Sequence, residues 1–112
     1  MKVSTYLDAK PIQEWPGVTK RDVITDKDGA PNFAMRVFEV GPGISTPPHS
    51  HPWEHEVFIL SGQGVVISEQ RETKIKQGSV IFIPPNEPHH FTNKGNEPLR
   101  FICLIPLLNL EF

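Results

Sequence analysis

The sequence predicts an all-β protein in which short strands form a sandwich or barrel. Proline supplies 12 of the 112 residues, about twice its usual share, and proline breaks helices but tolerates turns and strand ends. Glycine and proline divide the chain into short runs rich in valine, isoleucine and phenylalanine, and no segment has a convincing helical period. Many short strands with regular turn signals favour a sandwich or barrel over a helical bundle.

Turn signals place each strand in order. The strands expected in the first half of the chain are Thr19–Thr25, Asn32–Val40, Ile44–His51 and Glu54–Ser61. Those expected in the second half are Val65–Glu69, Thr73–Lys76, Ser79–Ile83, His89–Asn93 and Leu99–Ile105. The turn signals are Asp28-Gly29, Gly41-Pro42-Gly43, Pro47-Pro48, Gly62-Gln63-Gly64, Gln77-Gly78, Pro84-Pro85-Asn86 and Lys94-Gly95-Asn96. These residue types are typical of turns because they adopt or fix backbone angles that other residues avoid.

The two ends of the chain differ from this pattern. The chain through Pro16 is expected to be irregular or to pack on a neighbouring subunit. The segment Leu107–Phe112 is apolar for a solvent-exposed tail, so we expect it to cover a sheet edge or an interface. No linker or internal repeat divides the chain, so residues 1–112 are expected to form a single domain.

Composition excludes several classes of function. The formal net charge of −2 argues against nucleic acid or an anionic membrane as the main partner. The single cysteine, Cys103, rules out an intramolecular disulfide and a CxxC motif. The first residues lack the apolar stretch of a secretory signal, and no run is long enough to span a membrane. We therefore expect a soluble, cytoplasmic protein with a small-molecule partner.

Histidines are concentrated in one short segment. The chain has five, and three of them lie within seven residues, at positions 49, 51 and 55. On a strand, alternate side chains share a face, so His49 and His51 point the same way. A turn at Pro52 lets His55 on the next strand face them, and His89 at the start of a later strand can complete the set.

Four imidazoles on one face predict a bound transition metal. The alternative is that each histidine is a surface or core residue with its own hydrogen-bond partner. Buried imidazoles cannot all satisfy one another, however, and each one that becomes charged repels the rest. A divalent ion removes both conflicts, because neutral imidazole is a preferred ligand of Zn, Cu, Fe and Ni. We expect one divalent transition-metal ion, and the residues leave Mn, Fe, Ni, Zn and Cu open.

The same segment and a later one resemble the two sequence motifs of the cupin superfamily. The first cupin motif runs Gly, five residues, His-x-His, three or four residues, Glu, six residues, Gly. Here residues 43–62 read Gly43, His49-Ser50-His51, His55 and Gly62 at that spacing. The second motif runs Gly, five residues, Pro-x-Gly, two residues, His, three residues, Asn. Here residues 78–93 read Gly78, Pro84-Pro85-Asn86, His89 and Asn93.

The resemblance implies a double-stranded β-helix, the jelly-roll barrel of the cupins, with a metal inside. It is closest to small single-domain bacterial cupins, some of which bind metal with four histidines and many of which are homodimers. Carried over to this chain, the ligands are His49, His51, His55 and His89. A homodimer is expected on the same basis.

This chain departs from the cupin motifs at two positions. His55 occupies the position of the usual glutamate ligand, and Glu56 beside it fits the alternative four-residue spacing. Glu56 has the opposite strand parity to His49 and His51, so we favour His55. Asn86 replaces a glycine in the second motif, and asparagine tolerates the left-handed backbone that such a turn requires.

Four neutral ligands leave a divalent ion with its full +2 charge, whereas three histidines and a glutamate leave +1. The site should therefore favour anionic ligands. An octahedral ion would keep two open positions, which suits a dioxygenase-type oxidoreductase acting on a small chelating or anionic molecule. The alternatives are a non-redox metal-dependent isomerase or decarboxylase, and a non-catalytic small-molecule-binding module. A tetrahedral four-histidine Zn site would be closed and structural.

Strand parity also predicts residues that line a substrate pocket: Arg36, Phe38, Phe91, Phe101 and Cys103. Met35 and Val37, which have the opposite parity to Arg36 and Phe38, are the alternative inward residues of that strand. The alternative for the aromatic side chains is that they are ordinary barrel core. Cys103 is either a buried inert thiol or a thiol close to the metal and open to oxidation.

Other polar and aromatic residues near the motifs receive simpler interpretations. His90 has the opposite parity to His89 and is expected outside the ligand set. Glu54 and Glu56 are expected to be solvated charges, or to orient an imidazole. Trp53 is expected to pack the turn or an interface. No catalytic residue is identified.

Overall fold

The structure is a computed structural model that describes residues 1–107, and it consists of two antiparallel sheets. The strands of the larger sheet are β1 (Ile12–Trp15), β2 (Val18–Ile24), β3 (Phe33–Val40), β4 (His55–Ser61), β7 (Val80–Ile83) and β9 (Leu99–Pro106). The strands of the smaller sheet are β5 (Gln63–Ser68), β6 (Arg71–Lys76) and β8 (His90–Asn93). Apart from 3-10 turns at Tyr6–Asp8 and Asp26–Asp28, this part of the chain has no helix.

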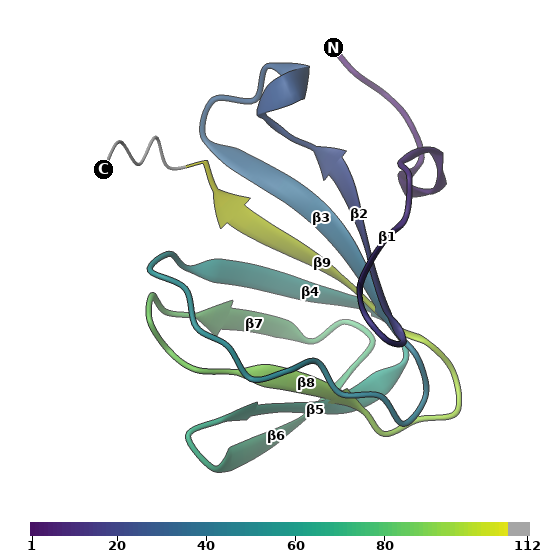
Figure 1. The fold of residues 1–112 in the computed structure, drawn as a ribbon, viewed down its shortest axis with the longest axis vertical. Coiled ribbons are helices and arrows are strands. Elements are labelled where there is room, and N and C mark those ends of the chain that lie inside the picture. The colour runs from purple at the N-terminus through teal and green to yellow at the C-terminus, as the bar shows by residue number, and fades with distance from the viewer. Residues whose placement is uncertain (108–112) are drawn as a thin grey trace.

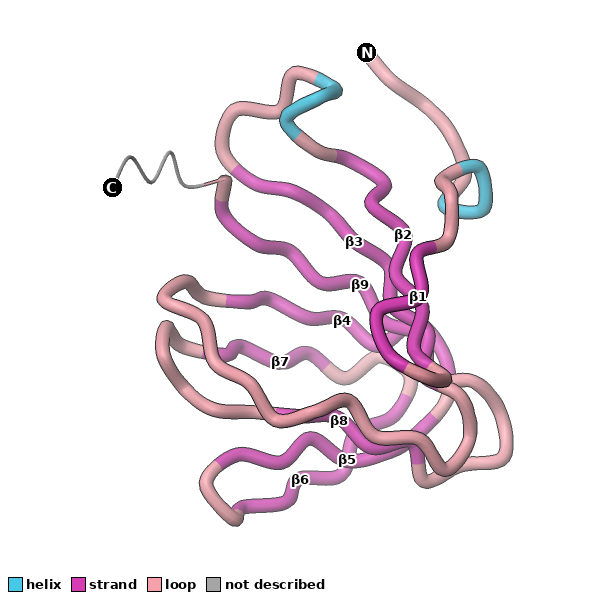
Figure 2. The backbone as a smooth tube through the Cα atoms, in the orientation of Figure 1, coloured by secondary structure: helices cyan, strands magenta, loops and turns pink. Residues whose placement is uncertain are grey.

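The two sheets curve around a common interior (Figure 1). The strand order is β1-β2-β3-β9-β4-β7 in the larger sheet and β6-β5-β8 in the smaller sheet. The long connection from β3 to β4 runs alongside β8 (Figure 2). The all-β prediction is confirmed, and every predicted strand outside residues 44–51 is present with bounds shifted by two residues or fewer.

One predicted strand is wrong. Residues 44–51 form only isolated bridges, Ser45 with Thr92 and His49 with His89, instead of a continuous ladder. Pro47 lies between these bridges and has no N–H group to donate to a partner strand. The segment nevertheless stays beside β8, because the N–H of Thr46 donates to the carbonyl oxygen of Phe91 at 2.8 Å.

The N-terminal prediction is also wrong in part. The chain before Pro16 contains β1, which pairs antiparallel with β2 in the register Ile12 with Lys20. This strand is short and mostly exposed, so it has little of the apolar alternation by which strands are recognised. The predicted cover formed by Leu107–Phe112 lies outside the described residues, except that the N–H of Leu107 donates to the carbonyl oxygen of Asn32.

Strand register stacks the inward side chains of the larger sheet in layers. One layer consists of Arg36 on β3, Cys103 on β9 and Val57 on β4. The next layer consists of Phe38, Phe101 and Ile59 in the same strand order. Val40 and Leu99 follow and are fully buried. Because inward positions recur every second residue, His55 lies one position beyond Val57 on β4, on the opposite side of this layer from Ile59.

Candidate metal centre

Four histidines meet inside the barrel from three segments of the chain. His49 and His51 lie on the connection between β3 and β4, His55 begins β4, and His89 immediately precedes β8. The backbone N–H of His49 donates to the carbonyl oxygen of His89 at 3.1 Å, and the reverse bond measures 3.0 Å. This reciprocal pair aligns the two cupin-like motifs, although they are far apart in sequence.

The four imidazole rings form a closed circuit. Ring centroids are 4.9 Å apart for His49 and His51 and 5.3 Å apart for His51 and His55. The circuit closes through His89, whose ring centroid lies 5.0 Å from that of His55 and 4.5 Å from that of His49. The interplanar angles lie between 44° and 67°. Tilted rings, unlike stacked ones, can turn their edges towards a shared centre.

Backbone carbonyl groups fix the orientation of two of these rings. The Nδ1–H of His49 donates to the carbonyl oxygen of Pro47 at 2.8 Å, and the Nδ1–H of His89 donates to that of Glu87 at 3.0 Å. With the proton on Nδ1, the Nε2 atom of each ring carries a lone pair. A hydrogen bond of this kind commonly orients a metal-binding histidine.

The donor set fits a divalent ion in its chemistry but is not arranged around one. As the side chains stand, residues 1–107 contain no group of three or more His, Cys, Asp or Glu placed to hold a metal. His55 Nδ1 is buried without a hydrogen-bond partner, which costs about 1–3 kcal/mol for a polar group. Small rotations about the side-chain torsions move ring nitrogens without moving the backbone. The four histidines are therefore suitable metal ligands by type and position.

Burial keeps three of these imidazoles, those of His51, His55 and His89, neutral near pH 7. Desolvation, together with the smaller effects of the neighbouring His89 and Arg36, lowers the pKa of His55 to about 3. Desolvation is also the main cause that lowers the pKa of His51 and of His89. A neutral imidazole is the form that binds a metal. Desolvation therefore leaves these rings in the protonation state that metal binding requires.

Two tryptophans flank the cluster, and the sequence assigned neither a role in it. The indole of Trp53 stacks on the ring of His51, with centroids 4.6 Å apart and an interplanar angle of 6°. The ring of Trp15 lies 6.0 Å from that of His49. Trp53 therefore packs the turn, as predicted, and it does so directly against a site histidine. The stacking depends on the path of the Pro52-Trp53 turn, which residue spacing alone does not define.

The side chains next to His55 point to the opposite side of the sheet, because side chains alternate along a strand. His55 is 4% exposed and faces the other three rings, whereas Glu54 and Glu56 are exposed on the outside of β4. The φ angle of Asn86 is 68°, so this residue does adopt the left-handed backbone of the turn before His89. His90 pairs with Ile67 on β5. It directly follows His89, so its side chain points to the other side of the strand from the four clustered rings.

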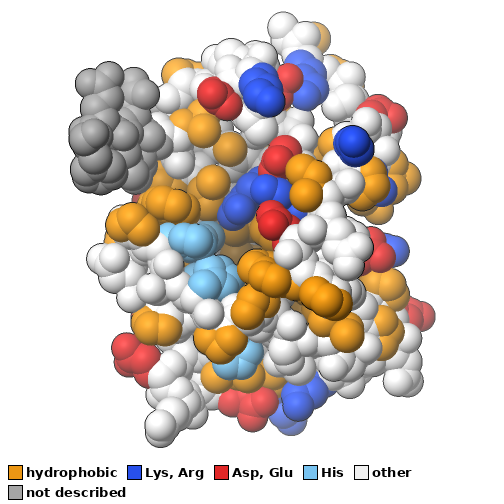
Figure 3. Space-filling view, in the orientation of Figure 1, with side chains coloured by type: hydrophobic (Ala, Val, Ile, Leu, Met, Phe, Trp, Pro, Cys, Tyr) orange, Lys and Arg blue, Asp and Glu red, His pale blue; other side chains and the backbone are white. Residues whose placement is uncertain are grey.

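The five nominated pocket residues lie together on the inward side of the barrel. The rings of Phe91 and Phe101 stack at 4.6 Å, and those of Phe38 and Phe101 stack at 5.3 Å. The Nη2 of Arg36 donates to Cys103 Sγ at 3.0 Å. Burial raises the pKa of the Cys103 thiol against the opposing effect of Arg36, which favours the protonated thiol near pH 7. In space-filling view, histidine, basic, acidic and apolar side chains all lie around the hollow in the middle of one face (Figure 3).

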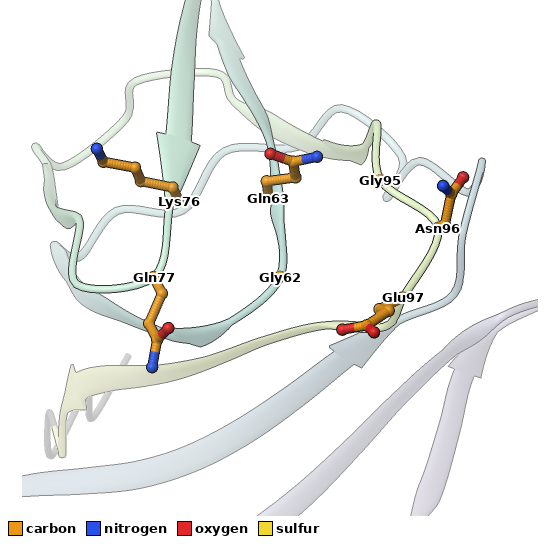
Figure 4. A pocket seen from close by; sticks show the side chains of 7 residues that line it. All are labelled: Gly62, Gln63, Lys76, Gln77, Gly95, Asn96 and Glu97. Carbon is orange, nitrogen blue, oxygen red and sulfur yellow. The ribbon is translucent and has the colours of Figure 1, made fainter.

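A second hollow has a different lining. A cavity of about 550 Å³ lies among the turns at the far end of the strands, lined by Gly62, Gln63, Lys76, Gln77, Gly95, Asn96 and Glu97. These side chains come from three different turns and spread apart rather than converge (Figure 4). The residues that line this cavity include no histidine or cysteine.

This arrangement of fold and site defines the class of protein. The family described as "Cupin domain" matches residues 36–105, which include both motifs and all four clustered histidines. The chain therefore belongs to the cupin family. No helix within residues 1–107 is long and apolar enough to cross a membrane.

Solved structures agree with this fold. The polyketide cyclase RemF from Streptomyces resistomycificus is 36% identical, with a TM-score of 0.88, over 96% of this chain and 80% of RemF. A predicted oxalate decarboxylase from Thermotoga maritima is 28% identical, with a TM-score of 0.81, over 96% of this chain and all of its own length.

Sequence relatives match over shorter segments. An oxalate-binding protein of Thermotoga maritima is 40% identical over 68 residues, which is 60% of this chain and 56% of that protein. An uncharacterised protein of Methanocaldococcus jannaschii is 37% identical over 62 residues, or 54% of this chain and 50% of that protein. The chain thus spans about half the length of these sequence relatives.

Proposed function

We propose that this cupin binds one divalent transition-metal ion through His49, His51, His55 and His89, and that the bound ion receives a small chelating or anionic molecule. The observation that carries the proposal is the closed circuit of four imidazole rings, with neighbouring centroids 4.5 to 5.3 Å apart. Three further features support it: the backbone-held Nδ1 atoms, the lowered pKa values, and the unpartnered Nδ1 of His55.

The charge of the site favours an anion. Four neutral imidazoles leave the ion its full +2 charge in a partly desolvated interior, where electrostatic attraction is stronger than in water. When bound, the ion would polarise an oxygen atom of the ligand and, if redox-active, supply electrons. The chain's own part is to exclude water with Phe91 and Phe101, both nearly fully buried, and to hold the four ring donors.

The reaction itself has two candidates. The first is oxygen-dependent oxidation of the bound molecule, which suits a redox-active ion with open positions. The second is a non-redox conversion or simple binding. It is favoured by the relatives, since one is called an oxalate-binding protein and another a polyketide cyclase. Oxygen uptake by the Fe- or Mn-loaded protein with a panel of enolic and phenolic compounds and oxalate supports the first, and turnover or binding that is unchanged without oxygen supports the second.

Metal analysis of adjacent variants tests the proposed site. His55→Ala and Glu56→Ala alter neighbouring positions on β4 that face opposite sides of the sheet. We expect about one divalent ion per chain in the unaltered protein and in Glu56→Ala, and strong loss in His55→Ala, because only His55 faces the other rings. Equal metal content in all three proteins, or no uptake by the unaltered protein, would contradict the proposal.

We also propose that a second copy of the chain covers the outer face of β4 and β7. Phe58, Val80 and Phe82 are 45%, 75% and 58% exposed there, and they border a groove of about 330 Å³ that also contacts Ile102 and Leu104. A large exposed apolar patch marks an interface, and a twofold dimer needs only one such patch because both copies use it.

Light scattering tests this dimer. We expect a dimer mass for the unaltered protein and a monomer for Phe82→Lys, because a buried lysine without a partner is costly. A matched exchange on the other sheet, Glu72→Lys, should leave the dimer intact. A monomeric unaltered protein would contradict the proposal.

A further inference from the structure

Arg36 is a cation on the inward side of the barrel, close to the histidine cluster. It lies on β3 opposite Cys103 of β9, and its guanidinium sits over the ring of Phe38, 5.0 Å from the ring centroid. The register layers place it one inward position from the level of His55.

The charge of Arg36 has no carboxylate partner among residues 1–107. Ion pairs in this part of the chain involve Lys2, Lys20 and Arg100. The guanidinium of Arg36 instead donates to the neutral sulfur of Cys103, and its Nε is buried without any hydrogen-bond partner. A half-buried arginine normally pairs with an anion, because desolvating an unpaired charge is expensive.

The nearest acidic residue in the strand register is already engaged. Asp22 on β2 pairs with Arg36 in the ladder, but its carboxylate lies 3.4 Å from Nζ of Lys20. Lys20 is also held by Glu14 at 3.0 Å. Two neighbouring cations on this face therefore differ: Lys20 has two carboxylates within 3.4 Å, whereas no carboxylate of residues 1–107 lies within ion-pair distance of Arg36.

We infer that Arg36 anchors one carboxylate of a small dianionic ligand whose other end reaches the histidine cluster. The inference rests on the proposed function for the second end of the ligand. The planar guanidinium presents several N–H donors in a fixed fork, which matches the two oxygens of a carboxylate. Arg36 on β3 and His55 on β4 are separated by β9, that is by two strand spacings of about 4.8 Å as well as one inward step of about 7 Å along the strands. The long side chain of Arg36 spans part of this separation, so a short dicarboxylate is the ligand to test.

Binding of malonate and its neutral diamide, malonamide, tests the inference. Calorimetric titrations are made on Zn-loaded and on metal-free protein, and Zn affinity is measured separately by chelator competition. We expect Arg36→Gln to weaken malonate binding at least about 10-fold, because a charge-assisted hydrogen bond is lost. Binding of malonamide and of Zn should stay within about 2-fold of the unaltered protein, since neither uses the charge.

Two further variants separate an anchoring role from a structural one. Arg36→Lys keeps the charge but loses the fork, so its malonate affinity should lie between that of the unaltered protein and Arg36→Gln. Lys76→Gln removes an exposed cation from the turn-lined cavity at the far end of the strands, so malonate binding should change by less than about 2-fold. If Arg36→Gln does not fold, Arg36→Lys decides instead: weaker malonate binding supports the inference, and unchanged binding overturns it.

The inference and the proposed function can fail separately. Equal malonate affinity in the unaltered protein and Arg36→Gln overturns the role of Arg36, while Zn retention leaves the metal proposal standing. If the unaltered protein binds no Zn, the metal proposal fails, and the metal-free titration decides for Arg36. Weaker malonate binding in Arg36→Gln then supports the anchor, and equal or absent binding overturns it.

Discussion

The histidine cluster and the turn-lined cavity at the far end of the strands are both hollows of the same barrel, but they are built differently. The far cavity is bordered by tight turns and by exposed polar side chains such as Lys76 and Gln77. The histidine cluster contains two titratable residues that are only 4% exposed, His55 and His89, and polar atoms without partners at His55 and Arg36.

The two hollows show that the volume of a cavity does not determine the chemical character of the side chains that line it. At the turns, polar groups are hydrated, and backbone geometry sets which residues fit. At the histidines, ionisable groups are desolvated, which stabilises the neutral forms of His51, His55 and His89. Polar atoms of His55 and Arg36 also lack hydrogen-bond partners there. Substitutions at the two places should therefore change different measured quantities: ligand and metal affinity at the histidines, and folding stability at the turns.

The largest expected effect is on metal affinity. His89→Ala should weaken divalent-metal binding by more than about 100-fold, because even residues that merely orient a metal ligand commonly contribute 10- to 100-fold. Lys76→Ala at the far cavity should leave metal affinity unchanged. Chelator competition measures both. Similar losses of metal affinity in the two variants would show that the histidine cluster is not the region that binds the metal.

The turn region should respond through stability instead. Gly62 and Gly78 both have a φ of 88°, but a Cβ on Gly62 would lie 2.6 Å from the carbonyl oxygen of Pro98, whereas one on Gly78 would meet nothing within 4 Å. Gly62→Ala should lower the free energy of unfolding by about 2–3 kcal/mol and Gly78→Ala by about 1 kcal/mol. Urea denaturation gives both values, and equal losses would contradict the steric argument.

The pH dependence of metal-free stability should come from the histidine end. The pKa of His55 is lowered to about 3 in the folded protein, below its ordinary value of about 6.5. The unfolded chain therefore binds a proton more readily, so stability is complete above about pH 6.5 and falls as the pH drops towards 3. His55 should contribute a loss of about 1–2 kcal/mol between pH 6.5 and 5.

Denaturation of His55→Leu supplies the control for that prediction. Leucine cannot titrate, so the variant should lose less stability than the unaltered protein over the same pH interval. Identical pH profiles for the two metal-free proteins would show that His55 does not have the lowered pKa.

The smallest effect is expected at Trp53. Its indole stacks on His51, and aromatic stacking of this kind contributes about 0.5–1.5 kcal/mol. Trp53→Leu should therefore weaken metal binding by roughly 2- to 10-fold, and Trp53→Phe should recover part of the loss. Both affinities can be measured by chelator competition, and an unchanged affinity in the leucine variant would mean that the stacking does not hold the ring of His51 for a metal.

Much of this architecture follows from the sequence, for identifiable reasons. The turn residues and apolar runs define the strands. His49 and His51 do lie together, with ring centroids 4.9 Å apart, although the segment that carries them is not a continuous strand. The strand predicted over residues 44–51 failed because proline removes ladder hydrogen bonds, and β1 was missed because its pairing depends on the backbone rather than on an apolar pattern.

Other features of the site depend on tertiary packing. The tilt of the four rings, the stacking of Trp53 and the lack of a carboxylate beside Arg36 arise from side chains on different strands. No local pattern encodes them. The choice of metal is also absent from the sequence, because the same imidazoles bind several divalent ions.

X-ray absorption spectroscopy of the metal-loaded protein tests the central claim most directly. The account predicts four imidazole nitrogens at about 2.0–2.2 Å from one ion, with one imidazole fewer in His55→Ala and no change in Glu56→Ala. A coordination shell of oxygen atoms without imidazole, or a shell unaffected by His55→Ala, would contradict it.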